Sequence, residues 1–159
     1  MKQLILVDAC NVLHATAPYK ERLSEGMDQL GEELLERLRP LHDIDQWELH
    51  LVIDGKGSRL EQQFIDRTRT LSLVFSPSGQ QADTIIEAWL IRLGPDWRIK
   101  VVTNDRAITH TALAQGAEPL RPMDTLQWAD EVRSRATRDH KNQVNKPGTE
   151  FGNRLEGLL

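Results

Sequence analysis

Cysteine is almost absent from this sequence of 159 residues, because Cys10 is the only one. A single cysteine excludes an internal disulfide bond, so a reducing compartment is the expected environment. No apolar run approaches the roughly 20 residues of a membrane-spanning helix, and the first residues lack the basic region and apolar core of a signal peptide. We therefore expect a cytoplasmic protein without a membrane partner.

Zinc-ligand clusters and glycine-rich nucleotide loops are also missing. The five histidines lie far apart in the sequence, and none has the spacing of a metal ligand. The first apolar stretch is not followed by the glycine-rich turn that a dinucleotide-binding Rossmann domain requires. These absences disfavour a zinc centre and a Rossmann dinucleotide site.

Positive charge is scarce as well. The formal net charge is −4, which gives little support to nucleic-acid binding, because phosphate backbones favour basic surfaces. Residues 132–148 are an exception, with the basic side chains Arg133, Arg135, Arg138, Lys141 and Lys146 against Asp139 alone. This segment is either a solvated tail or a basic arm that collects a polyanion beside an acidic site.

The composition changes near residue 136, after which Asn, Lys, Gly and Pro are frequent and hydrophobic periodicity is weak. A chain of this length is long enough to bury one substantial core. We expect one domain over residues 1–135 and a basic, flexible tail over residues 136–159.

Three apolar stretches lead to an aspartate. Residues 4–7 precede Asp8, residues 51–53 precede Asp54, and residues 101–102 lead through two polar residues to Asp105. Short continuous apolar runs are typical of strands buried on both faces of a parallel sheet. Ligands bind at the carboxyl ends of such strands, so these three aspartates mark a candidate site.

Strands alternate with helices along the chain. Strands are predicted at residues 4–8, 47–53, 71–75, 99–103 and 117–120, and helices at 22–39, 58–69, 106–115 and 124–135. A further helix is predicted to open on a capping box of Ser78 and Gln81 and to run to about Leu93. This pattern predicts an α/β fold, three-layered, with a central, mostly parallel five-stranded sheet in the order 3-2-1-4-5. That order places Asp8 and Asp105 on either side of the switch-point crevice.

Asp83 and Glu87 lie four residues apart on the predicted helix before the fourth strand, and therefore share one face. They are either solvated acids near the positive end of the helix dipole or part of the site. If Asp8, Asp83 and Asp105 meet, they repel one another, and a divalent cation keeps them ionised. Oxygen ligands select Mg²⁺ or Mn²⁺ rather than zinc, and such a metal can activate water against a phosphodiester.

Polar residues beside these acids extend the candidate site. Asn11, three residues after Asp8, is placed to hold a metal-bound water or a phosphate oxygen. Asn104 and Arg106 flank Asp105, and a guanidinium suits a phosphate. Asp54 is either another acid at the rim or the start of a turn with Gly55.

Four segments in order resemble the NYN-domain proteins of the YacP-like branch, which are PIN-like, metal-dependent ribonucleases. They are residues 8–11 (Asp-Ala-Cys-Asn), 52–55 (Val-Ile-Asp-Gly), 75–83 (Phe-Ser-Pro-Ser-Gly-Gln-Gln-Ala-Asp) and 101–107 (Val-Val-Thr-Asn-Asp-Arg-Ala). The resemblance covers about residues 3–130 and implies a PIN-like fold that cuts RNA internally with Mg²⁺ or Mn²⁺. It implies that Asp8, Asp83 and Asp105 bind the metal, with Asn11 beside them. Glu87 and Asp54 are second-tier acids.

The predicted RNA contacts are Arg106, Asn104, Lys56, Arg59, Arg133, Arg135 and Arg138. The small basic surface suggests that a partner, such as the ribosome or another large assembly, delivers the RNA.

Two places depart from the family pattern. Ala9 and Cys10 stand where the family usually has glycine and an aromatic residue, and Asn104 stands where serine is common. The first change affects the backbone freedom of the turn and removes a surface for base stacking. Neither change removes a carboxylate, so activity is expected to survive, with an altered substrate preference.

Two other protein classes are each excluded by a single residue. A haloacid-dehalogenase phosphatase needs a second aspartate where this chain has Cys10, and a receiver domain needs one after the third strand, where it has Ser76. A PIN-like domain that binds RNA or the ribosome without cutting remains open. The nuclease should bind Mn²⁺ through Asp8, Asp83 and Asp105, whereas the binding module need not.

Overall fold

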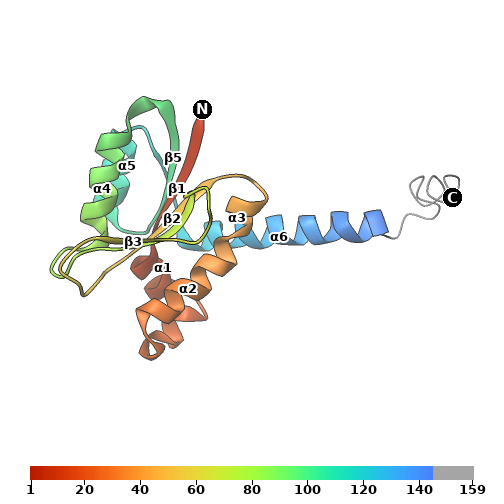
Figure 1. The fold of residues 1–159 in the computed structure, drawn as a ribbon, viewed down its shortest axis with the longest axis horizontal. Coiled ribbons are helices and arrows are strands. Elements are labelled where there is room, and N and C mark those ends of the chain that lie inside the picture. The colour runs from red at the N-terminus through yellow and green to blue at the C-terminus, as the bar shows by residue number, and fades with distance from the viewer. Residues whose placement is uncertain (145–159) are drawn as a thin grey trace, which may run out of the picture.

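A six-stranded sheet forms the centre of the computed structural model, which describes residues 1–144 (Figure 1). The strands lie in the order β3-β4-β2-β1-β5-β6, and all neighbours are parallel except β3 and β4. Their bounds are Lys2–Asp8 (β1), Glu48–Ile53 (β2), Glu61–Phe64 (β3), Leu71–Phe75 (β4), Trp97–Val102 (β5) and Glu118–Leu120 (β6). The α/β class and the relative order of the five predicted strands are confirmed, and a sixth strand is added at one edge.

That additional strand, β3, corrects the prediction of a short helix over residues 58–69. Glu61 pairs with Phe75 and Phe64 pairs with Ser72, so the segment runs back along β4 as an antiparallel edge strand. Gln62 and Phe64 are half-buried while Glu61 and Gln63 are exposed. This two-residue alternation is that of a strand, but it covers four residues and is too short to outweigh a polar composition.

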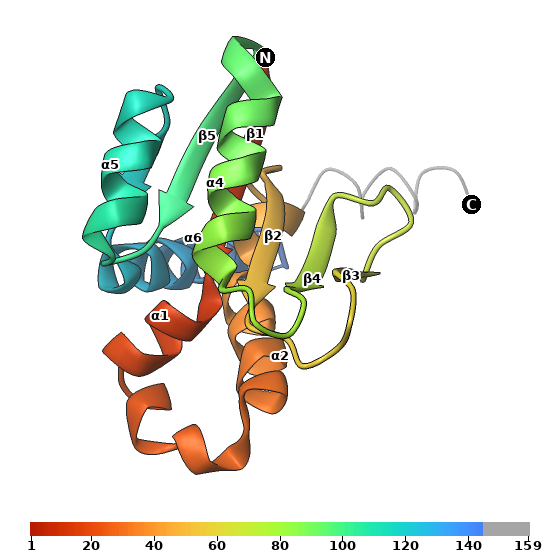
Figure 2. The same cartoon turned by 90° about the vertical axis from the view of Figure 1, so that its left-hand side faces the viewer.

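Helices cover both faces of the sheet (Figure 2). Their bounds are Ala9–Ala15 (α1), Met27–Leu38 (α2), Pro40–Asp43 (α3), Ala82–Leu93 (α4), Arg106–Ala114 (α5) and Pro122–Val144 (α6). Helix α1, directly after Asp8, is missing from the sequence prediction. The helix predicted over residues 22–39 begins only at Met27, after the short 3₁₀ helices Tyr19–Glu21 and Leu23–Glu25.

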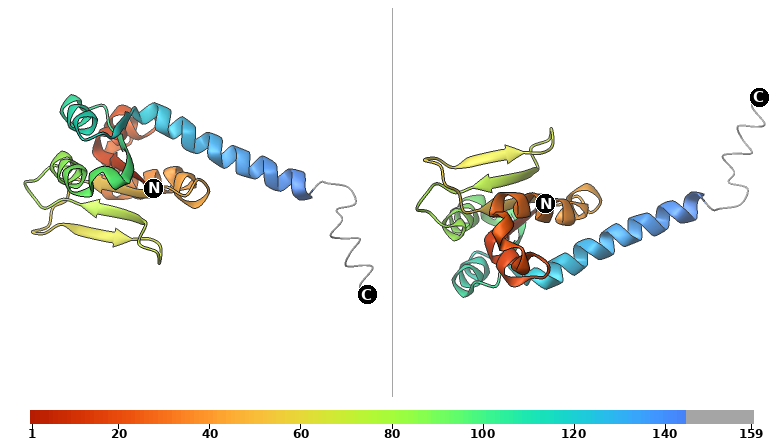
Figure 3. Two further views of the ribbon diagram at one scale, coloured as in Figure 1. Left: turned by 90° about the horizontal axis from the view of Figure 1, so that it is seen from above. Right: turned by 90° about the horizontal axis from the view of Figure 1, so that it is seen from below.

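Helix α6 is longer than predicted, since it reaches Val144, the last described residue, rather than stopping near residue 135. Its first half packs into the core through Leu126, Ala129 and Val132, and its second half projects beyond the sheet (Figure 3). Residues 145–159, which belong to the predicted tail, lie outside the described residues. Within residues 1–144, no helix has the length and apolar character needed to cross a bilayer.

Each face of the sheet carries its own hydrophobic core. Ile5 and Val7 of β1 pack with helices α1, α2 and α6, whereas Leu4 and Leu6 pack with α4 and α5. Successive strand residues point to opposite faces, so each strand supplies both cores. We refer to the two sides as the α1/α2/α6 face and the α4/α5 face.

Candidate active site

Four neighbouring strands each have a polar side chain at the carboxyl end, on the α4/α5 face of the sheet. Asp8 lies two residues beyond Leu6, which belongs to the core of that face, and is therefore on the same side of β1. The equivalent residues after β2, β4 and β5 are Asp54, Ser76 and Thr103. Because these strands are parallel neighbours, their polar ends lie along one edge of the sheet.

Asp8 is the one buried acid among residues 1–144, with 7% of its surface exposed. Its Oδ2 accepts from Thr103 Oγ1 at 3.2 Å, and its Oδ1 accepts from the backbone N–H of Asn11 at 3.5 Å and so caps α1. Burial, together with the smaller effect of the charges of Asp54 and Asp105, raises the pKa of Asp8 to about 6 against the opposing effect of these hydrogen bonds. A buried carboxylate of this kind is suited to a cation.

Thr103 connects Asp8 to Asp105. Its hydroxyl donates to Asp8 and accepts from the backbone N–H of Asp105 at 2.9 Å. The Oδ1 of Asp105 accepts from the backbone N–H of Ile108 at 3.1 Å, so Asp105 caps α5. Thr103 is absent from the predicted site, although its place two residues after buried Val101 puts it on the same face as Asp8.

Asn11 joins α1 to the loop after β5. Its Oδ1 accepts from the backbone N–H of Asn104 at 2.8 Å. The amide oxygen is therefore engaged, and the Nδ2 protons are the donors that a substrate or a water would meet. These two predicted site residues are in direct contact, and together they hold the loop that carries Asp105.

Asp54 ties the start of α4 to this edge of the sheet. Its Oδ1 accepts from the backbone N–H of Ala82 at 2.7 Å. The predicted capping box is wrong, because the N-cap residue is Gln81 and makes no side-chain capping bond. A side chain from another strand does the capping, and no local sequence pattern could reveal this.

Asp83 and Glu87 occupy the first half of α4 and are both half-buried. Asp83 follows the residue that Asp54 holds, and its Oδ1 accepts from the backbone N–H of Thr84 at 2.9 Å. Within residues 1–144 no hydrogen bond joins Asp83 to Asp8. Glu87 Oε1 lies 3.5 Å from the Oγ1 of Thr111 on α5, so this acid faces the neighbouring helix.

A cleft of about 170 Å³ adjoins Asp54, and Lys56 and Arg59 line it. Gly55 forms part of its wall and lies so close to Ser76 that a Cβ atom there would overlap the Ser76 carbonyl oxygen. The Gly55 N–H also donates to Ser76 Oγ at 3.2 Å. Only glycine permits this close backbone approach, which joins the ends of β2 and β4.

The predicted basic residues lie in separate places. Arg106 is exposed at the first position of α5, directly after Asp105, and Lys56 and Arg59 are exposed beside Asp54. These three cations therefore flank the acidic edge on two sides.

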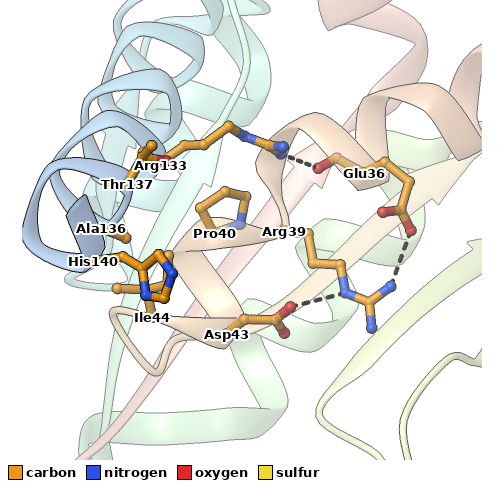
Figure 4. Close-up of a pocket in the computed structure, with 9 residues that line it drawn as sticks. All are labelled: Glu36, Arg39, Pro40, Asp43, Ile44, Arg133, Ala136, Thr137 and His140. Atoms are coloured by element: carbon orange, nitrogen blue, oxygen red, sulfur yellow. Dashed lines mark hydrogen bonds and ion pairs between the residues drawn. The ribbon is translucent and has the colours of Figure 1, made fainter. Parts of the chain in front are cut away.

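The arginines of α6 lie elsewhere. Arg133 donates to the backbone oxygen of Glu36 at 2.8 Å, beside the groove between α3 and α6 (Figure 4), and Arg135 pairs with Asp45 at 3.1 Å. Asp45 shortly precedes the amino end of β2, opposite the end that carries Asp54. Arg138 is exposed further along α6. The structure does not bring these arginines to the acidic edge.

The carboxylates fit a hard cation by their chemistry but are not gathered as a complete ligand set. Within residues 1–144, no three His, Cys, Asp or Glu side chains lie together in a way that could hold a metal ion. One carboxylate oxygen accepts a hydrogen bond from a backbone N–H in each of Asp54, Asp83 and Asp105. The other oxygen of each aspartate could bind a metal ion. Oxygen donors around a buried, repelled carboxylate suit Mg²⁺ or Mn²⁺.

Cys10 is poorly suited to nucleophilic chemistry. It is half-buried, and burial raises the pKa of its thiol to about 11, with the charges of Asp54 and Asp8 adding to the shift. A thiol with this pKa is protonated at neutral pH, and a protonated thiol is a poor nucleophile.

Known structures share this fold. A crystal structure of Rae1 (YacP) from Bacillus subtilis, a tryptophan-to-leucine mutant, superposes with a TM-score of 0.75 at 17% identity, covering 96% of this chain and 89% of that one. A second crystal structure of Rae1 (YacP) from Bacillus subtilis gives a TM-score of 0.73 at 21% identity, covering 98% and 90%. No curated protein sequence matches significantly.

The family comparison covers nearly all of the chain. Residues 5–157 match the YacP-like NYN domain, so the matched segment includes the carboxylates after β1, β2 and β5 and the start of α4. The chain belongs to the YacP-like NYN domain family.

Proposed function

We propose that the protein is a metal-dependent endoribonuclease whose site lies at the carboxyl ends of β1, β2 and β5 on the α4/α5 face. Membership of the YacP-like NYN family supports a ribonuclease-like role related to RNA. The observation that carries the proposal is the buried Asp8 carboxylate, which is held beside the negative charges of Asp54 and Asp105. A fold gains no stability from such repulsion, and a divalent cation removes it.

Asp8, Asp83 and Asp105 are the proposed metal ligands, with Mg²⁺ or Mn²⁺ as the ion. The bound ion would orient and activate water and neutralise charge on the phosphodiester. Thr103 holds Asp8 and the Asp105 backbone in one register, and Asn11 fixes the loop between them. Asp54 anchors the start of α4 and thereby sets the position of Asp83.

RNA would approach this edge across the exposed cations Arg106, Lys56 and Arg59. Asn104 is exposed in the loop before Asp105 and is a further proposed contact. Three cations neutralise few phosphates, so the affinity of the isolated protein for naked RNA should be low at physiological salt. We infer that a larger assembly, of which the ribosome is one example, presents the substrate.

The test is cleavage of a labelled mixed-sequence RNA with Mn²⁺, with Mg²⁺ and with EDTA. The wild type is compared with Asp8→Asn plus Asp105→Asn, and Asp45→Asn plus Asp130→Asn serves as the matched control. Both control aspartates pair with arginines away from the site. We expect internal cuts that need the metal, that fall at least about 100-fold in the site variant, and that persist in the control.

Other outcomes are equally informative. Mn²⁺ binding that the site variant loses, without cleavage of the test RNA, would retain the metal site and point to a missing substrate or partner. Absence of both cleavage and Mn²⁺ binding would refute the nuclease and leave a domain that binds RNA without cutting it.

A further inference from the structure

A second concave region lies on the α4/α5 face, at the end of the sheet opposite the acids. Its volume is about 230 Å³, and its walls come from the starts of β1, β2 and β5, from β3 and from the last turns of α4. The residues that matter here are His50, Phe64, Arg69, Trp89, Arg92 and Trp97. We refer to it as the aromatic pocket.

Aromatic side chains form the walls of the aromatic pocket. The His50 ring lies 5.6 Å from the Trp89 ring and 6.5 Å from the Phe64 ring, edge to face in both cases. His50 is buried, whereas Phe64, Trp89 and Trp97 are each half-buried and present part of their surface to the pocket. Half-buried aromatic rings around a hollow are characteristic of sites that take another flat ring.

A chain of hydrogen bonds fixes the polar side of this pocket. His50 Nε2 bonds to Glu48 Oε1 at 2.9 Å and His50 Nδ1 bonds to Ser72 Oγ at 2.6 Å. Gln62 Nε2 donates to the same Ser72 hydroxyl at 3.1 Å. An ionised carboxylate only accepts, so the N–H of His50 Nε2 is the donor in the bond to Glu48, and the second oxygen of Glu48 can accept from a ligand.

Arg69 is held over the rim in an unusual backbone conformation. Its φ is +61°, in the left-handed region, and its guanidinium carbon lies 4.4 Å from the Phe64 ring centroid. The Asp66 carboxylate supports this turn by accepting from the backbone N–H groups of Thr70 and Leu71, both at 3.0 Å. A strained residue kept in place by its surroundings is typical of a binding site. Exposed Arg92 adds a second cation to the rim.

We propose that the aromatic pocket binds one base of a single-stranded RNA whose backbone also reaches the acidic edge. The inference rests on the proposed ribonuclease function and adds a substrate subsite to it. Rings that stack, cations for phosphate and a carboxylate for base N–H groups are together the chemistry that recognises a nucleotide. The volume lies below the roughly 300 Å³ at which small-molecule pockets begin, so it suits one base and not a whole cofactor.

Helix α4 connects the two sites. Asp83 stands in its first turn and Arg92 in its last, nine residues apart, which corresponds to roughly 14 Å along the axis. Nucleotides that stay stacked rise about 3.4 Å each, so a stacked RNA that touches both places spans about four nucleotides, and an unstacked strand needs fewer. A dinucleotide, which has a single phosphodiester, is too short to use both sites, whereas a dodecamer is long enough.

Binding is measured by fluorescence anisotropy with a labelled mixed-sequence RNA dodecamer in EDTA, so that no cleavage occurs. We expect Trp89→Leu and Arg92→Gln each to weaken binding about tenfold and Trp89→Phe to restore it. Lys20→Gln plus Arg121→Gln removes two exposed charges outside the pocket and should change little. An abasic dodecamer should bind the wild type and Trp89→Leu equally. Arg92 is exposed, so Arg92→Gln keeps the test valid if Trp89→Leu unfolds.

Cleavage separates the pocket from the nuclease site. With Mn²⁺ present, Trp89→Leu should raise the KM for the dodecamer about tenfold and leave cleavage of the dinucleotide unchanged. Dodecamer binding and KM equal to wild type in both pocket variants would overturn the subsite while leaving the nuclease intact. Failure of the proposed function looks different, because the wild type would then cut neither RNA.

Discussion

The two faces of the sheet are built from the same strands but end differently. On the α1/α2/α6 face, Ile5 and Val7 are followed by buried Ala9, so the apolar series continues into α1. On the α4/α5 face, Leu4 and Leu6 are followed by Asp8. The α1/α2/α6 face therefore stays apolar up to the carboxyl end of β1, whereas the α4/α5 face carries a carboxylate there.

Strand alternation explains this separation of stability from chemistry. A shift of one residue in β1 would exchange the two sets of side chains, placing Asp8 among the leucines of α1 and α2. The register of Leu6 with His50 on β2 and with Val101 on β5 prevents the shift. The chemistry thus depends on a register that the apolar residues fix.

The largest change in the free energy of unfolding should come from a substitution on the α1/α2/α6 face. Leu34 of α2 is fully buried in the core of the α1/α2/α6 face. Leu34→Ala should lower the free energy of unfolding by about 2–5 kcal/mol, because it removes buried methyl groups and leaves a cavity. Urea unfolding measures this loss. Mn²⁺ affinity of the folded variant should equal that of the wild type, and a parallel loss of affinity would show that the faces are coupled.

A substitution on the α4/α5 face should change the free energy of unfolding in the opposite direction. Asp8→Asn should stabilise the metal-free protein by about 3 kcal/mol near pH 8, because burial raises the pKa of Asp8 from 3.8 to about 6. Above the folded-state pKa the full cost of the buried charge is present. The cost diminishes as the pH falls through about 6 and disappears below the unfolded-state value near 4.

Unfolding measured at about pH 8 and about pH 3 therefore checks the sign. The free energy of unfolding of the variant should exceed that of the wild type at the higher pH and equal it at the lower pH. A variant that is less stable than the wild type at both values would mean that the Asp8 carboxylate stabilises the fold.

The approach of β2 to β4 offers a smaller test. Gly55→Ala should cost about 1–3 kcal/mol, because the added Cβ overlaps the Ser76 carbonyl oxygen and the backbone must move. Gly57→Ala is the matched control, since the nearest atoms to its Cβ lie 3.9 Å away. Thermal unfolding of the two variants measures the difference. Equal stabilities would contradict the close approach that joins the ends of these strands.

The smallest effect concerns the capping of α4. Asp54→Ala removes the acceptor for the Ala82 N–H and should cost about 1 kcal/mol, whereas Asp54→Asn keeps an acceptor and should cost less. Both changes remove a charge that raises the pKa of Asp8, so that pKa should fall. NMR titration of the Asp8 carboxyl carbon measures the pKa. An unchanged value in both variants would remove Asp54 from the electrostatics of the site.

The parallel strands could be predicted from sequence because continuous apolar runs occur almost only where both faces are covered. The aspartates at the ends of β1, β2 and β5 could be found for the same reason, since Asp8 and Asp54 follow these runs directly and Asp105 follows after two polar residues. Helix α1 and strand β3 are short and carry weak periodicity, and their form depends on packing against distant segments.

Most features of the site that the sequence did not predict are hydrogen bonds between residues far apart in the chain. The bond from Ala82 to Asp54 spans 28 residues, and those from Thr103 to Asp8 and from Asn104 to Asn11 span 95 and 93. No local pattern reports such bonds. Thr103 was within reach of the alternation rule, because it follows Val101 as Asp8 follows Leu6.

The most direct test of the central claim is a calorimetric titration of the protein with Mn²⁺ in two buffers of different ionisation enthalpy. Metal ligands must be deprotonated, so binding near the pKa of Asp8, at about pH 6, should release about half a proton from this carboxyl group, and binding near pH 8 should release none from it. Asp8→Asn should abolish both the proton release and the tight binding. Binding of Mn²⁺ that is unchanged in Asp8→Asn, or an absence of binding by the wild type, would contradict a metal site built on Asp8.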